Sequence, residues 1–413
     1  MSNYITSIKV NHIFHLQDFV IPISEDKKKH LIITGKNGSG KTILLNAIIE
    51  YLNKIGYDES LNYKSLRGNL EYCQGELEKA QKNEDKAKCI SIQSNIDHYS
   101  KRIQDLFGKV ELFLADDYSL AKDLADRKFI IAYYSDERKS RFSEPKNPVK
   151  PNLEMSFDLK QSKVDQLLNF IVDCKIQEAL ARNEGKLEDA DYIRGWFDGF
   201  QDILREIFGD AALELVFNYK DYSFHIQSGG KSFKFTEVSA GYSAVLDIAT
   251  DLILKMQEQN QIIRAYEKEG IVLIDEIETH LHLELQRLIL PILTRLFPNI
   301  QFIVTTHSPF ILNSLSDIVA FDLEHREPIA DLTEYSYEAL AEGYFGVKTE
   351  SSEIEMRLNR MEELIKSSSL SLSEQKELGM YLADFEKMPE MVAPNVKARY
   401  YELNRMWNIK SGR

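Results

Sequence analysis

The sequence predicts an α/β fold with a mostly parallel sheet, an antiparallel β subdomain, helical insertions and a helical C-terminal region. Three observations support this prediction. The segments GIVLID (270–275) and IQFIVTTH (300–307) are short, nearly continuous apolar runs, typical of parallel strands that are covered on both faces. Residues 5–14 alternate apolar and polar side chains, as half-buried strands do. Long stretches elsewhere carry apolar residues at helical spacing.

Length and composition limit the class of protein. The chain has 413 residues, 43% of them hydrophobic and 28% charged, enough for one large or two medium domains with a buried core. We expect neither a membrane span nor a secretory signal, because the sequence has no long apolar run and no basic-then-apolar start. The cysteines Cys73, Cys89 and Cys174 are scattered, which excludes a zinc finger or a disulfide scaffold and favours a cytoplasmic location. With a net charge of -14, nucleic acid could bind only through a local basic patch.

The N-terminal part begins with strands and leads into a loop before a helix. After the alternating residues 5–14, FVIPI (19–23) is a second expected strand. HLIITG (30–35) is a short apolar run that ends at a glycine, and from Thr42 to Asn53 apolar side chains recur at helical spacing. Residues 35–42 are therefore predicted to form a loop between a buried strand and a helix.

Helical stretches divide the predicted core. Apolar residues repeat every three or four positions on both sides of the polar stretch KNEDKAK (82–88), which predicts an antiparallel helical hairpin with a narrow apolar seam. FIIAYYS (129–135) is a further expected strand. The expected segments are 1–60 for the first part of the core, 61–110 for the hairpin, 111–150 for core strands and a loop, 151–210 for a helical subdomain, 211–345 for the rest of the core, and 346–413 for C-terminal helices.

The loop at 35–42 has the sequence GKNGSGKT, which fits the phosphate-binding pattern Gly-x-x-x-x-Gly-Lys-Ser/Thr. Glycines allow the backbone to curl so that its N–H groups face an anion, and the helix that follows directs its positive end at the phosphates. Lys41 is expected to reach the β- and γ-phosphates of ATP, and the Thr42 hydroxyl to bind Mg²⁺. The predicted phosphate-contacting residues are Gly35, Asn37, Gly38, Ser39, Gly40, Lys41 and Thr42.

Two acids follow the apolar run Ile271–Ile274. Asp275 stands at the carboxyl end of the expected strand, where it should lie beside the phosphate loop and hold Mg²⁺ through water. Glu276 is the candidate general base that polarises the attacking water. Acids are common at strand ends, so this interpretation depends on the phosphate loop.

Two further elements could complete a nucleotide site. Ser239 and Gly241 precede a helical stretch, and a hydroxyl, a glycine and a helix N-terminus together favour an anion. His307 follows the apolar strand 300–305, from which it could hydrogen-bond a γ-phosphate or the attacking water. Either feature alone is more typical of a helix cap or of a structural histidine.

In order and spacing, these four elements resemble ABC-type ATPases, in the branch that contains SMC, RecF and OLD-like proteins. The resemblance rests on the segments GKNGSGKT, FTEVSAGYS, IVLIDEIETHLH and FPNIQFIVTTHSPFIL, and covers roughly residues 1–60 and 210–320. The stretches 275–282 and 305–309 are especially similar to stand-alone ATPases of bacterial anti-phage systems of the Septu and PARIS type. The fold implied is a P-loop NTPase with an ABC-type core.

The resemblance also implies an assembly and a role for each element. Ser239 and Gly241 would contact the γ-phosphate bound to a second subunit, so that a homodimer, or a higher homo-oligomer, encloses two ATP molecules. Residues 278–282 would form the segment that links the two sites. Ala240 and Tyr242 replace the glycine and glutamine of transporter domains, which argues against a transporter. No clear glutamine loop is present, although Asp136 or Arg138 could serve that region.

Three functions remain open at this stage. The first is an ATP-hydrolysing switch that controls an effector, expected to be a nuclease. The effector should be a separate chain, because no acidic nuclease block follows the core. The second is a RecF-like DNA-repair ATPase with a basic groove formed by Lys128, Arg138, Lys139 and Arg141. The third is a nucleotide-dependent scaffold with little turnover, whose aromatic and apolar anchors would be Tyr400, Tyr401, Met406 and Trp407.

Overall fold

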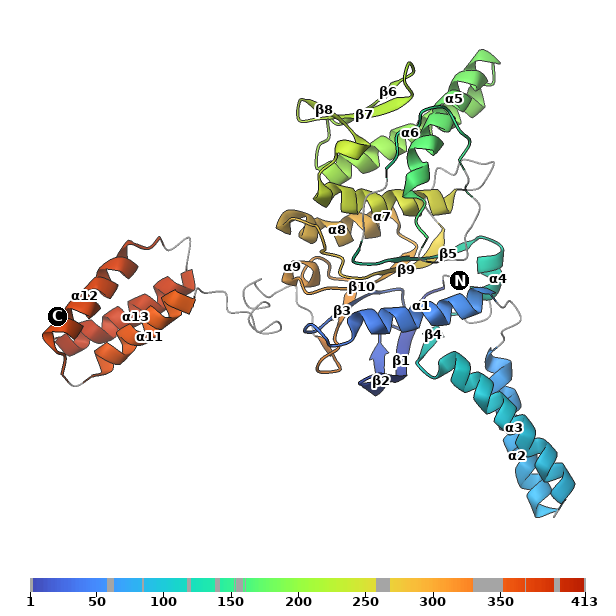
Figure 1. Ribbon diagram of the computed structural model, residues 1–413, viewed down its shortest axis with the longest axis horizontal. Coiled ribbons are helices and arrows are strands. Elements are labelled where there is room, and N and C mark those ends of the chain that lie inside the picture. Colours follow the sequence, from blue (N-terminus) through green and yellow to red (C-terminus); the bar gives the residue numbers. More distant parts are fainter. Residues whose placement is uncertain are drawn as a thin grey trace. The chain divides into compact units, whose positions relative to one another are not determined.

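The computed structural model describes most of the chain and divides it into two compact units, Met1–Tyr337 and Glu338–Arg413 (Figure 1). Each unit is described by itself. The finer division that the sequence suggests stays a prediction. The described residues are 3–57, 63–83, 85–116, 120–137, 142–151, 153, 159, 161–257, 268–329, 352–367, 369–389 and 394–411.

A sheet of six described strands forms the centre of the first unit, and it is mostly parallel, as the sequence predicts. Its strands lie in the order β12-β11-β3-β10-β9-β5, and every neighbouring pair is parallel except β11 with β12. Strands β5 and β10 are buried at every residue, which explains their unbroken apolar sequences. The bounds are β3 His30–Thr34, β5 Phe129–Tyr134, β9 Glu269–Ile274, β10 Ile300–Thr305, β11 Ile318–Asp322 and β12 Glu327–Ile329.

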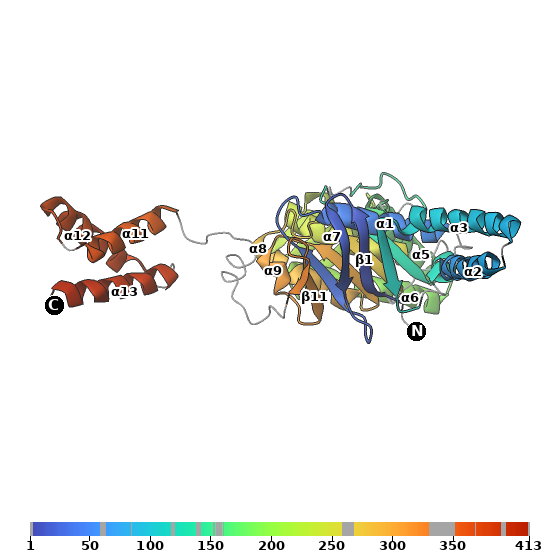
Figure 2. The ribbon, with the colours of Figure 1, turned by 90° about the horizontal axis from the view of Figure 1, so that it is seen from below.

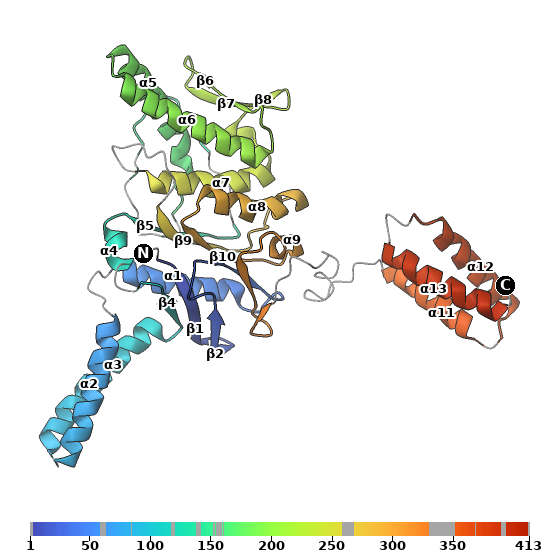
Figure 3. The same ribbon diagram turned by 180° about the vertical axis from the view of Figure 1, so that it is seen from behind.

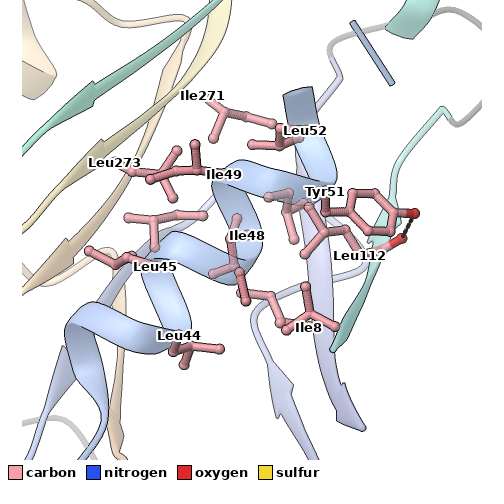
Figure 4. Packing of buried hydrophobic residues seen from close by; sticks show 14 of the residues in the cluster. Ile8, Leu44, Leu45, Ile48, Ile49, Tyr51, Leu52, Leu112, Ile271 and Leu273 are labelled. Carbon is pink, nitrogen blue, oxygen red and sulfur yellow. Dashed lines mark hydrogen bonds between the residues drawn. The ribbon is translucent and has the colours of Figure 1, made fainter. Parts of the chain in front are cut away.

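Helix α1 (Lys41–Tyr57) packs between this sheet and an antiparallel one. Figure 4 shows Leu45 and Ile49 of the helix directed at Leu273 of β9, and Ile48 close to Ile8 of the antiparallel sheet. Figure 2 shows that second sheet lying across α1. The helix is thus apolar on two sides, and the two contacts together fix its orientation relative to the parallel strands. The antiparallel sheet has the order β2-β1-β4, with β1 Ile5–Ile13, β2 Leu16–Pro22 and β4 Val110–Leu114.

Gln301 of β10 joins the two sheets. Its side chain is fully buried. The Oε1 atom accepts a hydrogen bond from the Ile5 N–H at 2.7 Å, and Nε2 donates to the carbonyl oxygens of Ile5 and Lys29, each at 2.9 Å. A buried amide whose hydrogen-bonding groups are satisfied in this way stabilises the contact between the two sheets.

Helices cover the opposite face of the parallel sheet, where α7 and α8 lie beside α5 and α6 (Figures 1 and 3). Trp196 of α6 is buried there, stacked on Phe200 with ring centroids 5.2 Å apart. A small antiparallel sheet, β6-β7-β8, adjoins these helices. The bounds are α4 Leu120–Ala125, η1 Val164–Gln166, α5 Leu167–Asn183, α6 Leu187–Phe208, β6 Glu214–Asn218, β7 Ser223–Ser228, β8 Lys231–Lys234, η2 Phe235–Glu237, α7 Ala240–Met256, α8 Leu283–Leu296 and α9 Pro309–Leu312.

The polar stretch at 82–88 separates two helices, α2 (Tyr63–Lys82) and α3 (Lys86–Phe107), that pack against each other. Asp85 caps α3, since its side chain accepts a hydrogen bond from the Lys88 N–H. Along the seam, Leu66, Ala80 and Ile92 are buried, while most of the remaining described surface of the hairpin is exposed. This agrees with the narrow apolar seam expected from the sequence.

Among the described residues of the second unit, three helices surround a core of its own, with Phe385 and Tyr400 in contact at 6.2 Å between ring centroids. Lys397 is buried, and its ammonium donates to the carbonyl oxygens of Phe385 and Glu386 at the end of α12. Of the four proposed anchors, Tyr400 and Trp407 pack on this core, whereas Tyr401 and Met406 are 51% and 39% exposed. Their role as an interface stays a prediction. The bounds are α11 Ser352–Lys366, α12 Leu372–Lys387 and α13 Pro394–Ser411.

Within the described residues, none of the helices is both long and apolar enough to span a bilayer.

His30 gives the fold a measurable pH dependence. Its Nδ1 accepts a hydrogen bond from the Phe302 N–H at 3.1 Å, and burial lowers its pKa from 6.5 to about 4. Because the unfolded chain takes up a proton before the folded one, the free energy of unfolding should fall by about 3 kcal/mol between pH 6.5 and 4 on account of this group. Urea titrations across that range should show a shallower dependence for His30→Asn, and no such change for the exposed His98→Asn.

Candidate active site

The phosphate loop connects β3 to α1 with a backbone that only glycine adopts easily. Gly35, Gly38 and Gly40 have φ angles of 136°, 84° and 100°. A Cβ atom at Gly40 would also lie 2.9 Å from the Leu16 Cδ1 atom, so a larger residue would have to displace the end of that side chain as well as adopt a strained conformation. The Ser39 N–H donates to the Lys36 carbonyl oxygen at 3.1 Å, which tightens the curl. The loop therefore has the shape that an anion cradle requires.

Lys41 lies inside this curl. Its side chain is buried, and Nζ donates to the carbonyl oxygens of Gly35 at 2.9 Å and Lys36 at 3.2 Å. Burial lowers the pKa of Lys41, and the nearby carboxylates Glu276, Glu278 and Asp275 oppose that shift. The electrostatic contacts show that the lysine and the acids occupy the same region.

Asp275 begins the acidic segment at the end of β9 and is 1% exposed. Its N–H donates to the Tyr134 carbonyl oxygen at 2.8 Å, and its Oδ1 accepts a hydrogen bond from the Thr305 hydroxyl at 2.6 Å. Since β9, β10 and β3 are parallel neighbours, the residues after each strand reach the same edge of the sheet. The expected proximity of Asp275 and the phosphate loop is thus present.

Glu276 has a φ angle of 44°, in the left-handed region that glutamate rarely adopts. Its N–H donates to the Thr305 hydroxyl at 2.8 Å, so Thr305 bonds both acids of the pair at once. Strain of this kind persists only where surrounding contacts hold it, and it is concentrated at functional sites. Sequence reasoning missed Thr305, because a threonine at the end of a strand has no distinctive pattern.

His307 follows β10 and is partly buried at the same edge. Burial lowers its pKa, the nearby Lys41 lowers it further, and Asp275 partly offsets both effects. The imidazole is therefore held toward its neutral form. A neutral imidazole can accept or donate one hydrogen bond at each nitrogen, which suits contact with a phosphate oxygen or a water molecule.

Glu278 is a second residue whose role sequence reasoning missed. Its Oε2 accepts a hydrogen bond from the Thr306 hydroxyl at 2.8 Å, and its Oε1 accepts one from the backbone N–H of His307. Burial raises its pKa. The only sequence signal is an acid two positions after Glu276, which becomes informative once the 306–307 pair is known to lie opposite.

The serine–glycine turn lies elsewhere on the chain. Ser239 precedes α7 and is exposed, whereas Gly241 is buried against the segment after Asp275. A Cβ atom at Gly241 would lie 3.3 Å from the His280 carbonyl oxygen. Among the described residues no hydrogen bond joins Ser239 or Gly241 to the phosphate loop. One copy of the chain thus brings together the loop, the acids and the histidine, but not the serine.

The end of β11 forms the other side of the phosphate loop. Lys36 makes an ion pair with Glu324 at 2.9 Å, and the Leu323 N–H donates to the carbonyl oxygen of Thr34, the last residue of β3. Asp322 is buried and accepts hydrogen bonds from the N–H groups of Glu324 and His325. These contacts anchor the start of the loop.

The remaining sequence candidates have mixed outcomes. Asp136 is exposed just beyond β5, at the edge of the sheet that carries the site. Of the proposed basic groove, Lys128 pairs with Asp126 at 3.1 Å. Three further basic candidates, Arg138, Lys139 and Arg141, lie outside the described residues. A glutamine-loop role and a DNA-binding groove both stay predictions.

The residue types at this edge suit a magnesium ion that is bound together with a nucleotide. Thr42 and Asp275 supply hydroxyl and carboxylate oxygens, the hard ligands that Mg²⁺ prefers. Across the described part of the chain there is no group of three or more histidine, cysteine or acidic side chains that could hold a metal. A cation with few protein ligands, completed by water and phosphate oxygens, is the typical arrangement for Mg²⁺ in nucleotide sites.

Comparison with known proteins places the chain in a family. The family described as "AAA domain, putative AbiEii toxin, Type IV TA system" matches residues 31–313. The Septu protein PtuA of Bacillus mycoides is 42% identical over 102 residues, 24% of this chain and 14% of that protein. The retron Vc95 probable ATPase of Vibrio cholerae is 23% identical over 363 residues, 72% of this chain and 69% of that protein. The retron Ec83 probable ATPase of Escherichia coli is 36% identical over 91 residues, 22% of this chain and 17% of that protein.

The matches to PtuA and to the Ec83 protein span well under two thirds of those relatives. Among solved structures, an SMC head bound to the C-terminal winged-helix domain of ScpA superposes with a TM-score of 0.40 at 14% identity, covering 77% of this chain and 94% of that one. The SMC head domain of Thermotoga maritima gives a TM-score of 0.35 at 11% identity, covering 76% and 94%.

Thr305→Val should destabilise the site. The substitution keeps the shape of the side chain but removes the two hydrogen bonds that Thr305 makes, to the buried Asp275 carboxylate and from the Glu276 N–H, at a cost of about 1–3 kcal/mol in the free energy of unfolding. Thr34→Val is the matched control, because Thr34 ends β3 and its buried hydroxyl has no hydrogen bond within the described structure. That variant should be neutral or slightly stabilising in urea denaturation. Equal effects of the two substitutions would contradict the assignment.

Proposed function

The chain belongs to the AAA domain family whose model it matches, and on this premise we propose that it binds ATP with Mg²⁺ and hydrolyses it between two copies of itself. Nucleotide-dependent pairing then switches a separate effector, a nuclease, in anti-phage defence. The defence role is proposed because the relatives include the Septu protein PtuA and two retron ATPases. The observation that supports hydrolysis is the meeting of Lys41, Asp275 and His307 at one edge of the sheet.

The proposed chemistry follows from the position of each group. Lys41 leaves its carbonyl partners and donates to phosphate oxygens when the triphosphate fills the curl. Thr42 and Asp275 would hold Mg²⁺, which would supply positive charge to neutralise the phosphates. Glu276 orients the attacking water. The hydrogen bond from its N–H to the Thr305 hydroxyl fixes its backbone at the end of β9. His307, held toward its neutral form, hydrogen-bonds the γ-phosphate or that water.

A second copy is proposed because, among the described residues, no hydrogen bond joins the serine–glycine turn to the phosphate loop of the same chain. Ser239 is exposed at the N-terminus of α7, a helix of 17 residues whose positive end suits an anion. A γ-phosphate held by one copy could be bonded by this turn of the other. Such bonds exist only while the triphosphate is intact, so hydrolysis would weaken the pair. This gives the effector a signal that depends on nucleotide state.

Glu276→Gln tests hydrolysis and pairing together. The variant keeps the size of the side chain but loses its basicity, so turnover should fall by about a hundredfold or more, with ATP binding retained. Phosphate release measures turnover, and light scattering after gel filtration with ATP measures mass. The variant with ATP should accumulate a dimer or a higher oligomer that the wild type releases.

Glu284→Gln is the matched control, since Glu284 is an exposed acid in the first turn of α8. It should behave as the wild type does. A wild type that binds ATP without measurable turnover would contradict the hydrolase and favour the scaffold that the sequence left open. Unchanged turnover in Glu276→Gln would remove Glu276 from the mechanism.

A further inference from the structure

Glu278 connects two segments that come from different parts of the chain. It lies three residues after Asp275, while both of its hydrogen-bond donors, the Thr306 hydroxyl and the His307 backbone N–H, follow β10. On the basis of the proposed function, we propose that Glu278 is a positioning residue. It holds His307 in place for hydrolysis and couples that histidine to the segment 278–282.

The Glu278 carboxylate lowers the stability of the fold at this position, so its presence calls for an explanation. A partly buried carboxylate loses hydration, and the neighbouring Glu276 adds like charge. An apolar pair at the same place would hold the segments together at lower cost. Unlike an apolar pair, the carboxylate orients the segment through directional hydrogen bonds. One of its oxygens accepts from the His307 N–H and the other accepts from the Thr306 hydroxyl.

A second link joins the same two segments on the other side of the histidine. The Ser308 hydroxyl donates to the Gln286 Oε1 at 2.7 Å, and the Gln286 Nε2 donates to the Leu281 carbonyl oxygen at 3.0 Å. His307 therefore lies between two residues that are hydrogen-bonded to the segment after Asp275. Thr306 bonds Glu278 directly, and Ser308 is connected to Leu281 through Gln286. On this proposal, a shift of the segment 278–282 moves the backbone of His307.

The same segment also contacts the serine–glycine turn. Gly241 lies against the carbonyl of His280, close enough that an added Cβ would be 3.3 Å from its oxygen. The order of contacts is thus the turn at 239–241, the segment 278–282, and then His307. A γ-phosphate that is held by another copy and binds Ser239 of this copy would then act on His307 of this copy through Glu278. It would not contact His307 itself.

A double-mutant cycle tests whether Glu278 acts through His307. In Glu278→Gln, an amide faces the Thr306 hydroxyl and the charge is lost, so kcat should fall by about tenfold to a hundredfold, as expected for a displaced catalytic group. ATP affinity, measured with a fluorescent ATP analogue, should change by less than about twofold because the phosphate loop is untouched. In the His307→Ala background, the same substitution should lower kcat by less than about twofold.

The possible outcomes separate the two proposals. Absence of turnover in the wild type removes the proposed function and this inference with it. Turnover in the wild type with fully additive losses, or an equal loss of ATP affinity and kcat, overturns only the role of Glu278. Glu284→Gln controls for the change of charge.

Thr306→Val keeps the inference testable if Glu278→Gln does not fold. That variant removes the hydroxyl that donates to Glu278. It should lower kcat in the wild-type background and have little effect in His307→Ala. A similar loss in both backgrounds would overturn the inference.

Discussion

Parallel pairing of β3, β10 and β9 is the constraint on which the rest of the structure depends. Thr305 pairs with Ile33, and Val304 pairs with Ile274, so the three strands end level with one another. A different functional group follows each strand. The phosphate loop follows β3, His307 follows β10, and the acids follow β9. Because parallel strands need long crossover connections, residues separated by more than 200 positions meet at one edge.

This meeting concentrates charge. Asp275, Glu276 and Glu278 all raise the pKa of one ammonium, that of Lys41, against the effect of its burial. Hydroxyl groups reduce the cost, since Thr305 donates to the first acid and Thr306 to the third. The two adjacent threonines thus hold the carboxylates apart and directed, before any phosphate or cation adds its own charge. A site organised in advance needs little rearrangement when charge develops during a reaction.

The sequence predicts local features better than pairwise ones. The loop at 35–42 and the strand 270–275 are visible because glycine spacing and apolar runs lie within a few residues of each other. Thr305 and Glu278 are not, since their roles depend on a register between strands about thirty residues apart in the chain. Gln301 is similar, because only the structure shows that its amide faces Ile5 in another sheet.

The serine–glycine turn differs from the other elements for a geometric reason. It begins α7, a helix on the opposite face of the sheet from α1, so no register brings it to the phosphate loop of the same chain (Figure 1). It does contact the segment 278–282, which continues from the acids. A ligand at the turn and a ligand at the loop would therefore act on one backbone segment from its two ends. Coupling between the two positions then requires no large rearrangement, only that this segment remain tied to His307.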